Sequence, residues 1–200
     1  FELFSEAVSD GSDWVVRSSS GKLSFGEIKR IRGALGSRPA HLLPVIETTA
    51  RVVPGGESSE ARSSSFRLVA TDAFALRNLL IESDRGDTTL ASFEPDSTDG
   101  PIALVATSDL AERHGFAAGD SVEVYLRDEI REIHIDAVFD PAIREEQSLQ
   151  NLMFGDIPTL QDLLENGSYA NRLEIVLAEG PDPEARSTAV GGVLREIKEP

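Results

Sequence analysis

The side chains of this chain that could do acid–base or metal chemistry are its three histidines and its many carboxylates. A histidine acts as a base or a metal ligand near neutral pH. No two of the three have the spacing that places two ligands on one helix face. We therefore predict solvated or capping roles for His41, which follows Pro-Ala, for His114 in the last turn of a helix, and for His134 on the polar face of a strand.

Paired carboxylates could serve as general acid and base in a hydrolase. Three close pairs occur: Asp128-Glu129, Glu145-Glu146 and Asp182-x-Glu184. All fall in predicted loops or at a helix start, where a solvated surface is the simpler interpretation. No stretch has the alternating acids and central glycine of a calcium loop. The sequence predicts no catalytic, cofactor-binding or metal-binding residues.

Three short motifs resemble functional sites, and each has a simpler structural interpretation. Gly119-Asp120-Ser121 resembles an esterase motif, but it follows a helix stop and opens an alternating strand, so a turn is predicted. Ser20-Gly21-Lys22-Leu23 lacks the first glycine and the hydroxyl of a phosphate loop. Asn166-Gly167-Ser168 matches a glycosylation sequon and also a helix stop. The chain contains no G-x-S-x-G elbow.

Composition sets limits on partners and on chemistry. The 200 residues contain no cysteine, which excludes disulfides and thiolate sites. Thirty-five acids against 19 bases give a net charge of −16, which disfavours nucleic acid and anionic lipid as partners unless basic residues are concentrated locally. With three lysines in the chain, we expect no such patch. No apolar run approaches the ~20 residues of a membrane span.

Periodicity predicts the elements of the first third of the chain. Apolar residues at helical spacing over 1–8 predict a helix, either a short terminal one or the cut end of a longer one. A strand follows at 14–17, and Ser24 with Glu27 forms a capping box for the next helix. Residues 41–53 are β-like with Pro44 at an edge or bend, and 66–70 form a strand. A short helix is predicted after Asp72.

The stretch 102–139 is the most regular. It reads as a buried strand, a helix capped by Thr107 or Ser108 and stopped by Gly115, and then an antiparallel hairpin. After a linker come a strand at 152–156, a helix from Pro158, a strand at 173–177 and a final helix opening at Asp182-Pro183. Strand–helix–strand units at 14–53 and 151–197 therefore flank a β-rich block.

Several of these segments together resemble the extracytoplasmic domain of FtsX/MacB-type ABC transporter permeases. Residues 103–124 (ALVATSDLAERHGFAAGDSVEV) are similar to the family's strand, "LAxxxG" helix and "GxxxGDxV" turn, and 135–139 to its "VxGIF"-like strand. The later segments 154–164 and 172–177 resemble its "xLQxLL" helix and the strand after it. Upstream, 43–53 and 66–72 are similar to "P-V-x-E…V" and "L-x-G-x-D", although Ala70 stands where the family has glycine.

The resemblance implies an α+β fold. A porter-like part of two strand–helix–strand units would carry a smaller inserted β-rich subdomain. On this basis we expect residues 1–13 to be a cut stalk helix from a first transmembrane segment, 14–82 with 140–200 the discontinuous porter-like part, and 83–139 the insert. The helix at 182–197 would be the second stalk.

The resemblance also implies a function. The chain would be a non-catalytic domain on the periplasmic or extracellular side of the cell membrane, relaying ATP-driven motion to a substrate or partner protein. Implied partners are a cytoplasmic ABC ATPase and a periplasmic adaptor, lipoprotein or cell-wall hydrolase, with a dimeric full-length protein and no nucleic acid. Contact regions are expected in the loops 54–64, 83–100 and 140–151.

Two alternatives remain open at this point. An exported acidic hydrolase would need a pocket that holds two carboxylates with pKa values pushed apart. A double-psi-barrel-type binding module would instead close a barrel around Gly119-Asp120.

Overall fold

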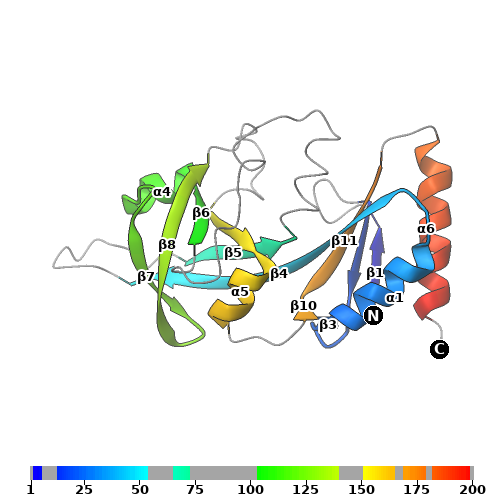
Figure 1. Ribbon diagram of the computed structural model, residues 1–200, viewed down its shortest axis with the longest axis horizontal. Helices are drawn as coiled ribbons and strands as arrows, with labels where there is room; N and C mark the ends of the chain where they lie inside the picture. The colour runs from blue at the N-terminus through cyan, green and yellow to red at the C-terminus, as the bar shows by residue number, and fades with distance from the viewer. Residues whose placement is uncertain are drawn as a thin grey trace. The chain divides into compact units, whose positions relative to one another are not determined.

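A computed structural model describes residues 2–5, 13–53, 65–72, 103–139, 151–164, 169–178 and 182–198 (Figure 1). The chain forms two compact units, each discontinuous in sequence. The first comprises Phe1–Ile46, Phe74–Gly86 and Gly167–Pro200, and the second Glu47–Ala73 and Asp87–Asn166. The chain is an α+β protein, as predicted. None of the described helices is both long enough and apolar enough to cross a lipid bilayer.

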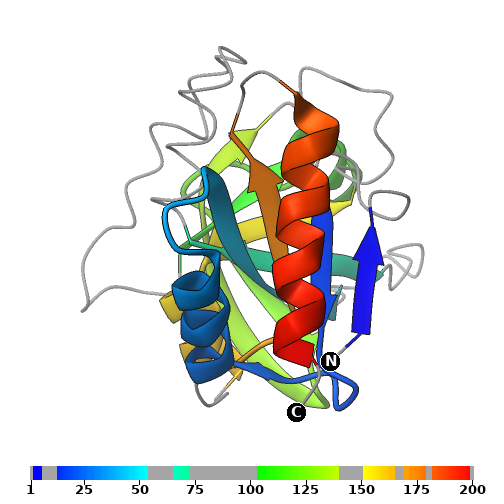
Figure 2. The ribbon, with the colours of Figure 1, turned by 90° about the vertical axis from the view of Figure 1, so that its right-hand side faces the viewer.

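The first unit is an antiparallel sheet with helices on one face. Its strand order is β1-β2-β11-β4, formed by β1 (Glu2–Ser5), β2 (Trp14–Arg17), β11 (Arg172–Leu177) and the start of β4 (Ala40–Val52). Helix α6 (Pro183–Lys198) lies along the sheet, and α1 (Phe25–Leu35) contacts α6 (Figure 2). The two-residue strands β3 (Leu23–Ser24) and β10 (Tyr169–Ala170) pair separately.

The connection β2–α1–β4 is a split strand–helix–strand motif. Strands β2 and β4 are both antiparallel to β11, which lies between them, so they run parallel to each other. The apolar stripe of α1, Ile28, Ile31 and Leu35, is buried as its helical spacing requires. The strand–helix–strand unit predicted at 14–53 is therefore confirmed, and β4 continues unbroken through Pro44.

The prediction of a helix over residues 1–8 is wrong for residues Glu2–Ser5. Residues Glu2–Ser5 form strand β1, which pairs antiparallel with β2 from Glu2 opposite Arg17 to Ser5 opposite Trp14. The stripe of apolar residues satisfied a helical period, but a helix shorter than about 12 residues has little stability of its own. Pairing with the exposed edge of β2 gives the segment backbone hydrogen bonds to a structured partner.

The second unit is built on a closed ring of strands. The ring consists of the end of β4, β5 (Ser65–Thr71), β9 (Leu152–Asp156), β6 (Ala103–Thr107), β8 (Glu129–Phe139) and β7 (Ser121–Leu126). Strand β7 also pairs with β4, Arg51 opposite Tyr125, and this pairing closes the ring. Helices α4 (Ser108–His114) and α5 (Ile157–Leu164) complete the unit.

The ring core is filled by one face of each strand. Its fully buried side chains include Phe66, Leu68, Leu104, Ile133, Ile135 and Met153. Alternation along β7, with Val124 and Leu126 buried and Glu123 and Tyr125 exposed, matches the predicted hairpin with one wet face. Arg127 and Asp128 make its two-residue turn, both at positive φ, which suits a hairpin connection.

The predicted bounds of the inserted subdomain, 83–139, differ from those of the second unit. The second unit also takes 47–73 and the segment through Asn166. The reason is strand pairing: β9 pairs with β5 and β6, and α5 packs on β5 and β9. The second predicted strand–helix–strand unit, 151–197, is therefore divided, because β9 and α5 belong to one unit and β11 and α6 to the other.

Candidate functional site

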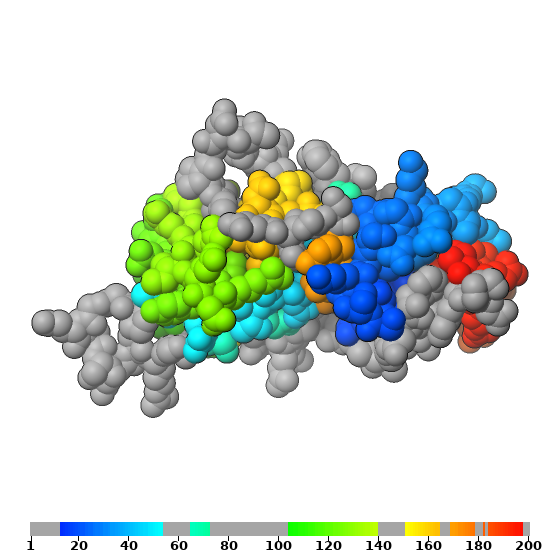
Figure 3. All heavy atoms as spheres, turned by 90° about the horizontal axis from the view of Figure 1, so that it is seen from below, coloured from blue at the N-terminus to red at the C-terminus, as the bar shows by residue number. Residues whose placement is uncertain are grey.

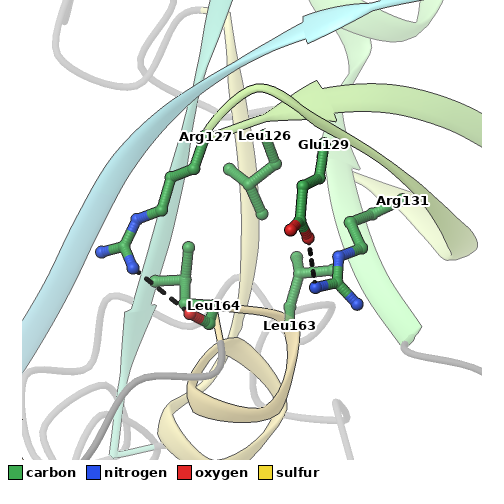
Figure 4. A pocket seen from close by; sticks show the side chains of 6 residues that line it. All are labelled: Leu126, Arg127, Glu129, Arg131, Leu163 and Leu164. Carbon is green, nitrogen blue, oxygen red and sulfur yellow. Dashed lines mark hydrogen bonds and ion pairs between the residues drawn. The ribbon is translucent and has the colours of Figure 1, made fainter.

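A small open pocket lies at the tip of the β7–β8 hairpin in the second unit (Figure 4). Its volume is about 240 Å³, and it is lined by Leu126, Arg127, Glu129, Arg131, Leu163 and Leu164. Arg127 donates from Nη1 to the carbonyl oxygen of Leu164 at 3.2 Å, so the hairpin turn caps the end of α5. Glu129 and Arg131 form an ion pair at 2.6 Å.

This pocket does not meet the requirement of the acidic-hydrolase alternative. General acid–base hydrolysis by two carboxylates needs both to face one substrate. The pocket has one carboxylate, Glu129, which is bound to Arg131 and is largely exposed. In the part of the chain that the structure describes, no group of three or more histidines, cysteines and acids is arranged to hold a metal ion.

Gly119-Asp120-Ser121 is a turn, as predicted. Gly119 has φ 93°, and its N–H donates to the carbonyl of Ile135 at 2.7 Å. The Asp120 carboxylate accepts from the backbone N–H of Ala117 at 2.7 Å. Ser121 opens β7 and lies opposite His134 in the hairpin register. Both side chains lie on the outer face of the hairpin, and the structure gives no hydrogen bond between them.

The histidines occupy the positions that the sequence indicates. His114 is in the last turn of α4 and stacks on Phe116, with ring centroids 5.3 Å apart. Burial, followed by the nearby charge of Arg113, lowers the pKa of His114 below its ordinary value. His41 is half-buried on β4, and His134 is on β8.

The remaining predicted candidates are parts of turns and caps. Gly21, with φ 69°, donates its N–H to the Ser18 carbonyl at 2.9 Å, which makes the suspected phosphate loop a tight turn. The Lys22 ammonium lies 4.8 Å from the centroid of the Tyr169 ring. Asp182 caps α6, since its Oδ1 accepts from Ala185 N–H at 3.0 Å. The pair Glu145-Glu146, the sequon 166–168, the helix predicted after Asp72 and the loops 54–64, 83–100 and 140–150 lie outside the described residues.

A polar cluster that the sequence did not indicate joins α4 to the start of β9. The Asn151 N–H donates to Asp109 Oδ2 at 2.8 Å, and its amide nitrogen donates to the Ser65 carbonyl at 2.7 Å. Arg113 donates to Asn151 Oδ1 at 2.8 Å. Asn151 has φ 56°, a conformation that asparagine tolerates better than most residues. These contacts fix the entry to β9.

Helix α6 packs closely on Trp14 in the first unit. The indole Nε1 donates to Ser187 Oγ at 3.1 Å. A Cβ built on Gly191 would lie 2.6 Å from Cζ2 of the same indole, so the helix backbone lies directly against the ring. This close approach accounts for a glycine inside a helix, where it costs about 1 kcal/mol relative to alanine.

A second set of contacts holds the start of α6. Arg186 donates to the carbonyl of Ala178, which follows β11. Asp13, next to Trp14, receives the Leu177 N–H on its carboxylate at 2.7 Å and donates its own N–H to Ile175 at 3.0 Å. Helix α6, β2 and β11 are thus held together by packing on the Trp14 indole and by hydrogen bonds.

The start of β1 and the end of α6 lie at the same end of the first unit (Figures 1 and 2). Strand β1 runs away from this end, and α6 returns to it.

No protein-family model and no curated protein matches this chain. The solved structures that are similar to it include two extracytoplasmic domains of transporters. The periplasmic region of MacB from Actinobacillus actinomycetemcomitans has a TM-score of 0.52 at 11% identity, covering 91% of this chain and 75% of that one. The extracellular domain of the noncanonic ABC-type transporter YknZ from Gram-positive bacteria has a TM-score of 0.54 at 9% identity, covering 92% and 91%.

The likeness extends over both units, because each match covers more than nine-tenths of this chain. This bears on the double-psi-barrel alternative. The closed ring that it requires is present in the second unit, but such a module leaves the antiparallel sheet of the first unit unaccounted for. The resemblance found in the sequence is confirmed at the level of the fold: the chain has the fold of the periplasmic region of MacB and of the extracellular domain of YknZ.

Proposed function

We propose that this chain is the non-catalytic extracytoplasmic domain of an ABC transporter permease, which relays ATP-driven motion to a substrate or partner protein outside the membrane. The observation that carries the proposal is the likeness to the MacB and YknZ domains over 91% and 92% of the chain. The partner inside the cell is an ABC ATPase. The partner outside is an adaptor, a lipoprotein or a cell-wall hydrolase, and the full-length protein is a dimer.

The geometry of the first unit supports a mechanical role. Segments leading to the membrane would enter through β1 and leave through α6, which lie at one end of this unit. A displacement of α6 is passed to the sheet through Trp14, because Ser187 and Gly191 both contact its indole. Such a relay requires rigid packed elements and no active site.

Two experiments test this proposal. The gene is expected to encode a span of about 20 apolar residues before residue 1 and another after residue 200. These 200 residues contain no cysteine, so a cysteine at the exposed position Ala118 is the only one in this domain, and the full-length protein without it is the labelling control. A membrane-impermeant maleimide is expected to label this cysteine in intact cells. Polar flanks, or labelling only after lysis, would refute the proposal.

A further inference from the structure

The charge of this chain is unevenly distributed. Residues 14–46 carry six basic side chains and a single acid, Glu27, although the whole chain has a net charge of −16. The Glu27 carboxylate is engaged in capping α1, since its Oε2 accepts from Ser24 N–H at 2.8 Å. The expectation that basic residues are nowhere concentrated is therefore wrong, because this segment holds four arginines together with two of the three lysines of the chain.

Two of these cations are engaged in hydrogen bonds to the backbone, and the other four are at the surface. Arg32 and Arg38 donate to carbonyl oxygens near the end of α1. The other four, Arg17, Lys22, Lys29 and Arg30, are exposed and make no ion pair within the described residues. We call these four residues the basic end. Lys22 also lies over the Tyr169 ring, which leaves its ammonium at the surface.

The basic end lies where the chain segments emerge. Arg17 and Lys22 flank the turn after β2. This turn, the start of α1, the start of β1 and the end of α6 lie at the same end of the first unit (Figure 2). Seen from below, these segments share one face of this unit (Figure 3). The third lysine, Lys198, is the last residue of α6.

Among the described residues, Glu2 stands opposite Arg17 in the β1–β2 register, and Glu196 is in the last turn of α6. On its other side Arg17 is opposite Arg172, whose guanidinium forms an ion pair with Glu174 at 2.7 Å. At physiological salt, charges more than about 8 Å apart are largely screened, so the local excess of cations decides what approaches this face.

We propose that the basic end rests on the anionic phospholipid headgroups of the membrane to which the domain is tethered. This inference rests on the proposed function, which places that membrane beside the ends of the chain. A lipid surface fits these cations, because a layer of headgroups needs no shaped groove and the four side chains are exposed on a turn and on a helix flank. Each cation near an anionic bilayer strengthens binding by about fivefold.

The test is co-flotation of the 200-residue chain with phosphatidylcholine vesicles containing or lacking 30% phosphatidylglycerol, at about 0.1 M salt. The chain is expected to bind only the anionic vesicles and to be released by about 0.5 M salt. Arg17→Gln, Lys22→Gln, Lys29→Gln and Arg30→Gln are each expected to weaken binding by about fivefold, and the quadruple variant to abolish it. Arg51→Gln, an exposed cation of the second unit, is the matched control and is expected to bind as the parent chain does.

Three results would overturn the inference. They are equal partition onto both kinds of vesicle, a quadruple variant that binds as the parent does, and displacement of the chain by inorganic phosphate or polyglutamate at constant ionic strength. Circular dichroism confirms that each variant is folded. If the parent chain does not bind vesicles, but apolar spans flank the sequence and Ala118→Cys is labelled in intact cells, the lipid contact is refuted and the transporter assignment stands. Vesicle binding alongside polar flanks refutes the transporter assignment.

Discussion

At the residue scale, the Glu27 side chain completes the N-terminal cap of α1. Ser24 Oγ accepts from Glu27 N–H at 3.2 Å, and the Glu27 carboxylate accepts from Ser24 N–H, so the capping box predicted from Ser-x-x-Glu is complete. The Ser24 side-chain hydrogen bond and then its backbone hydrogen bond lower the pKa of Glu27 below its ordinary value of 4.5. A lowered pKa of an acid means that folding favours the charged form.

Ser24→Ala is expected to lower the free energy of unfolding by about 1 kcal/mol at neutral pH. The contribution of Glu27 is present above pH 4.5 and is lost as the pH falls through the lower pKa of the folded state. In urea titrations, the difference between parent and variant should therefore shrink as the pH falls below 4.5. Ser37→Ala, at an exposed position after the helix, is the control. A difference that stays constant with pH would show that the carboxylate is not involved.

Thr107 shows that residue type can predict a position in the fold without predicting the hydrogen-bond partner of the side chain. It occupies the N-cap position of α4, as the sequence indicates, but its side chain makes no capping bond. Its hydroxyl instead donates to the Leu152 carbonyl at 3.1 Å and accepts from Leu152 N–H at 3.2 Å. The sequence identified the helix boundary, whereas the partner of the hydroxyl depends on a strand 45 residues away.

At the scale of elements, adjacent glycines in α6 have different environments. A Cβ on Gly191 meets the Trp14 ring at 2.6 Å, whereas a Cβ on Gly192 meets nothing within 4 Å. The indole is buried in the unit and is also hydrogen-bonded to Ser187, so it has little room to move away.

Gly192→Ala is expected to raise the free energy of unfolding by up to about 1 kcal/mol, because alanine is the better helix former. Gly191→Ala is expected to lower it by about 1–3 kcal/mol, because the added methyl group displaces the helix or the indole. Chemical denaturation measures both. The fluorescence of Trp14, the single tryptophan of the chain, should change in Gly191→Ala only. Equal stabilisation by both substitutions would show that α6 is not held tightly to the sheet.

Elements with local signals were predictable, and those that depend on distant partners were not. The strand at 152–156, the helix stop at Gly115 with φ 71° and the hairpin of β7 and β8 follow from alternation, turn residues and caps. The prediction of a helix over residues 1–8 was wrong, because so short an apolar pattern is compatible with a helix and with a strand. Pairing with the edge of β2 makes residues Glu2–Ser5 a strand. Among the short motifs, Gly119-Asp120 and Gly21 lie in turns and Asp182 caps α6, as their local signals indicate.

At the scale of the whole molecule, the resemblance indicated that a part of the chain is discontinuous in sequence, but the residues at which the two units divide were not predictable. The resemblance indicated one part interrupted by another, and two discontinuous units are found. Their bounds depend on the ring of the second unit, which closes through Arg51–Val52 of β4 and Val124–Tyr125 of β7. Pairings so far apart in sequence leave no local trace in composition or spacing.

The net charge of −16 leads to a prediction for the whole molecule. Repulsion among excess acids destabilises the compact state, and salt screens it. The melting temperature should therefore rise when the ionic strength is increased from about 0.01 to 0.15 M. Differential scanning calorimetry in sodium chloride measures the change, and the parent chain at about pH 4.5, where its charge is near zero, is the control. A melting temperature that falls with salt at neutral pH would mean that attractive pairs outweigh the repulsion.

The position of β11 between β2 and β4 has a consequence for biogenesis. Residues 14–17 are synthesised early but contact 172–177, so the first unit completes its sheet only when nearly the whole chain has been made. The strands of the closed ring all lie within 47–156, and they can assemble before then. Contacts between such distant residues slow folding. Until then, the edges of β2 and β4 that pair with β11 are unprotected, so this interval is the one in which a chaperone is most needed.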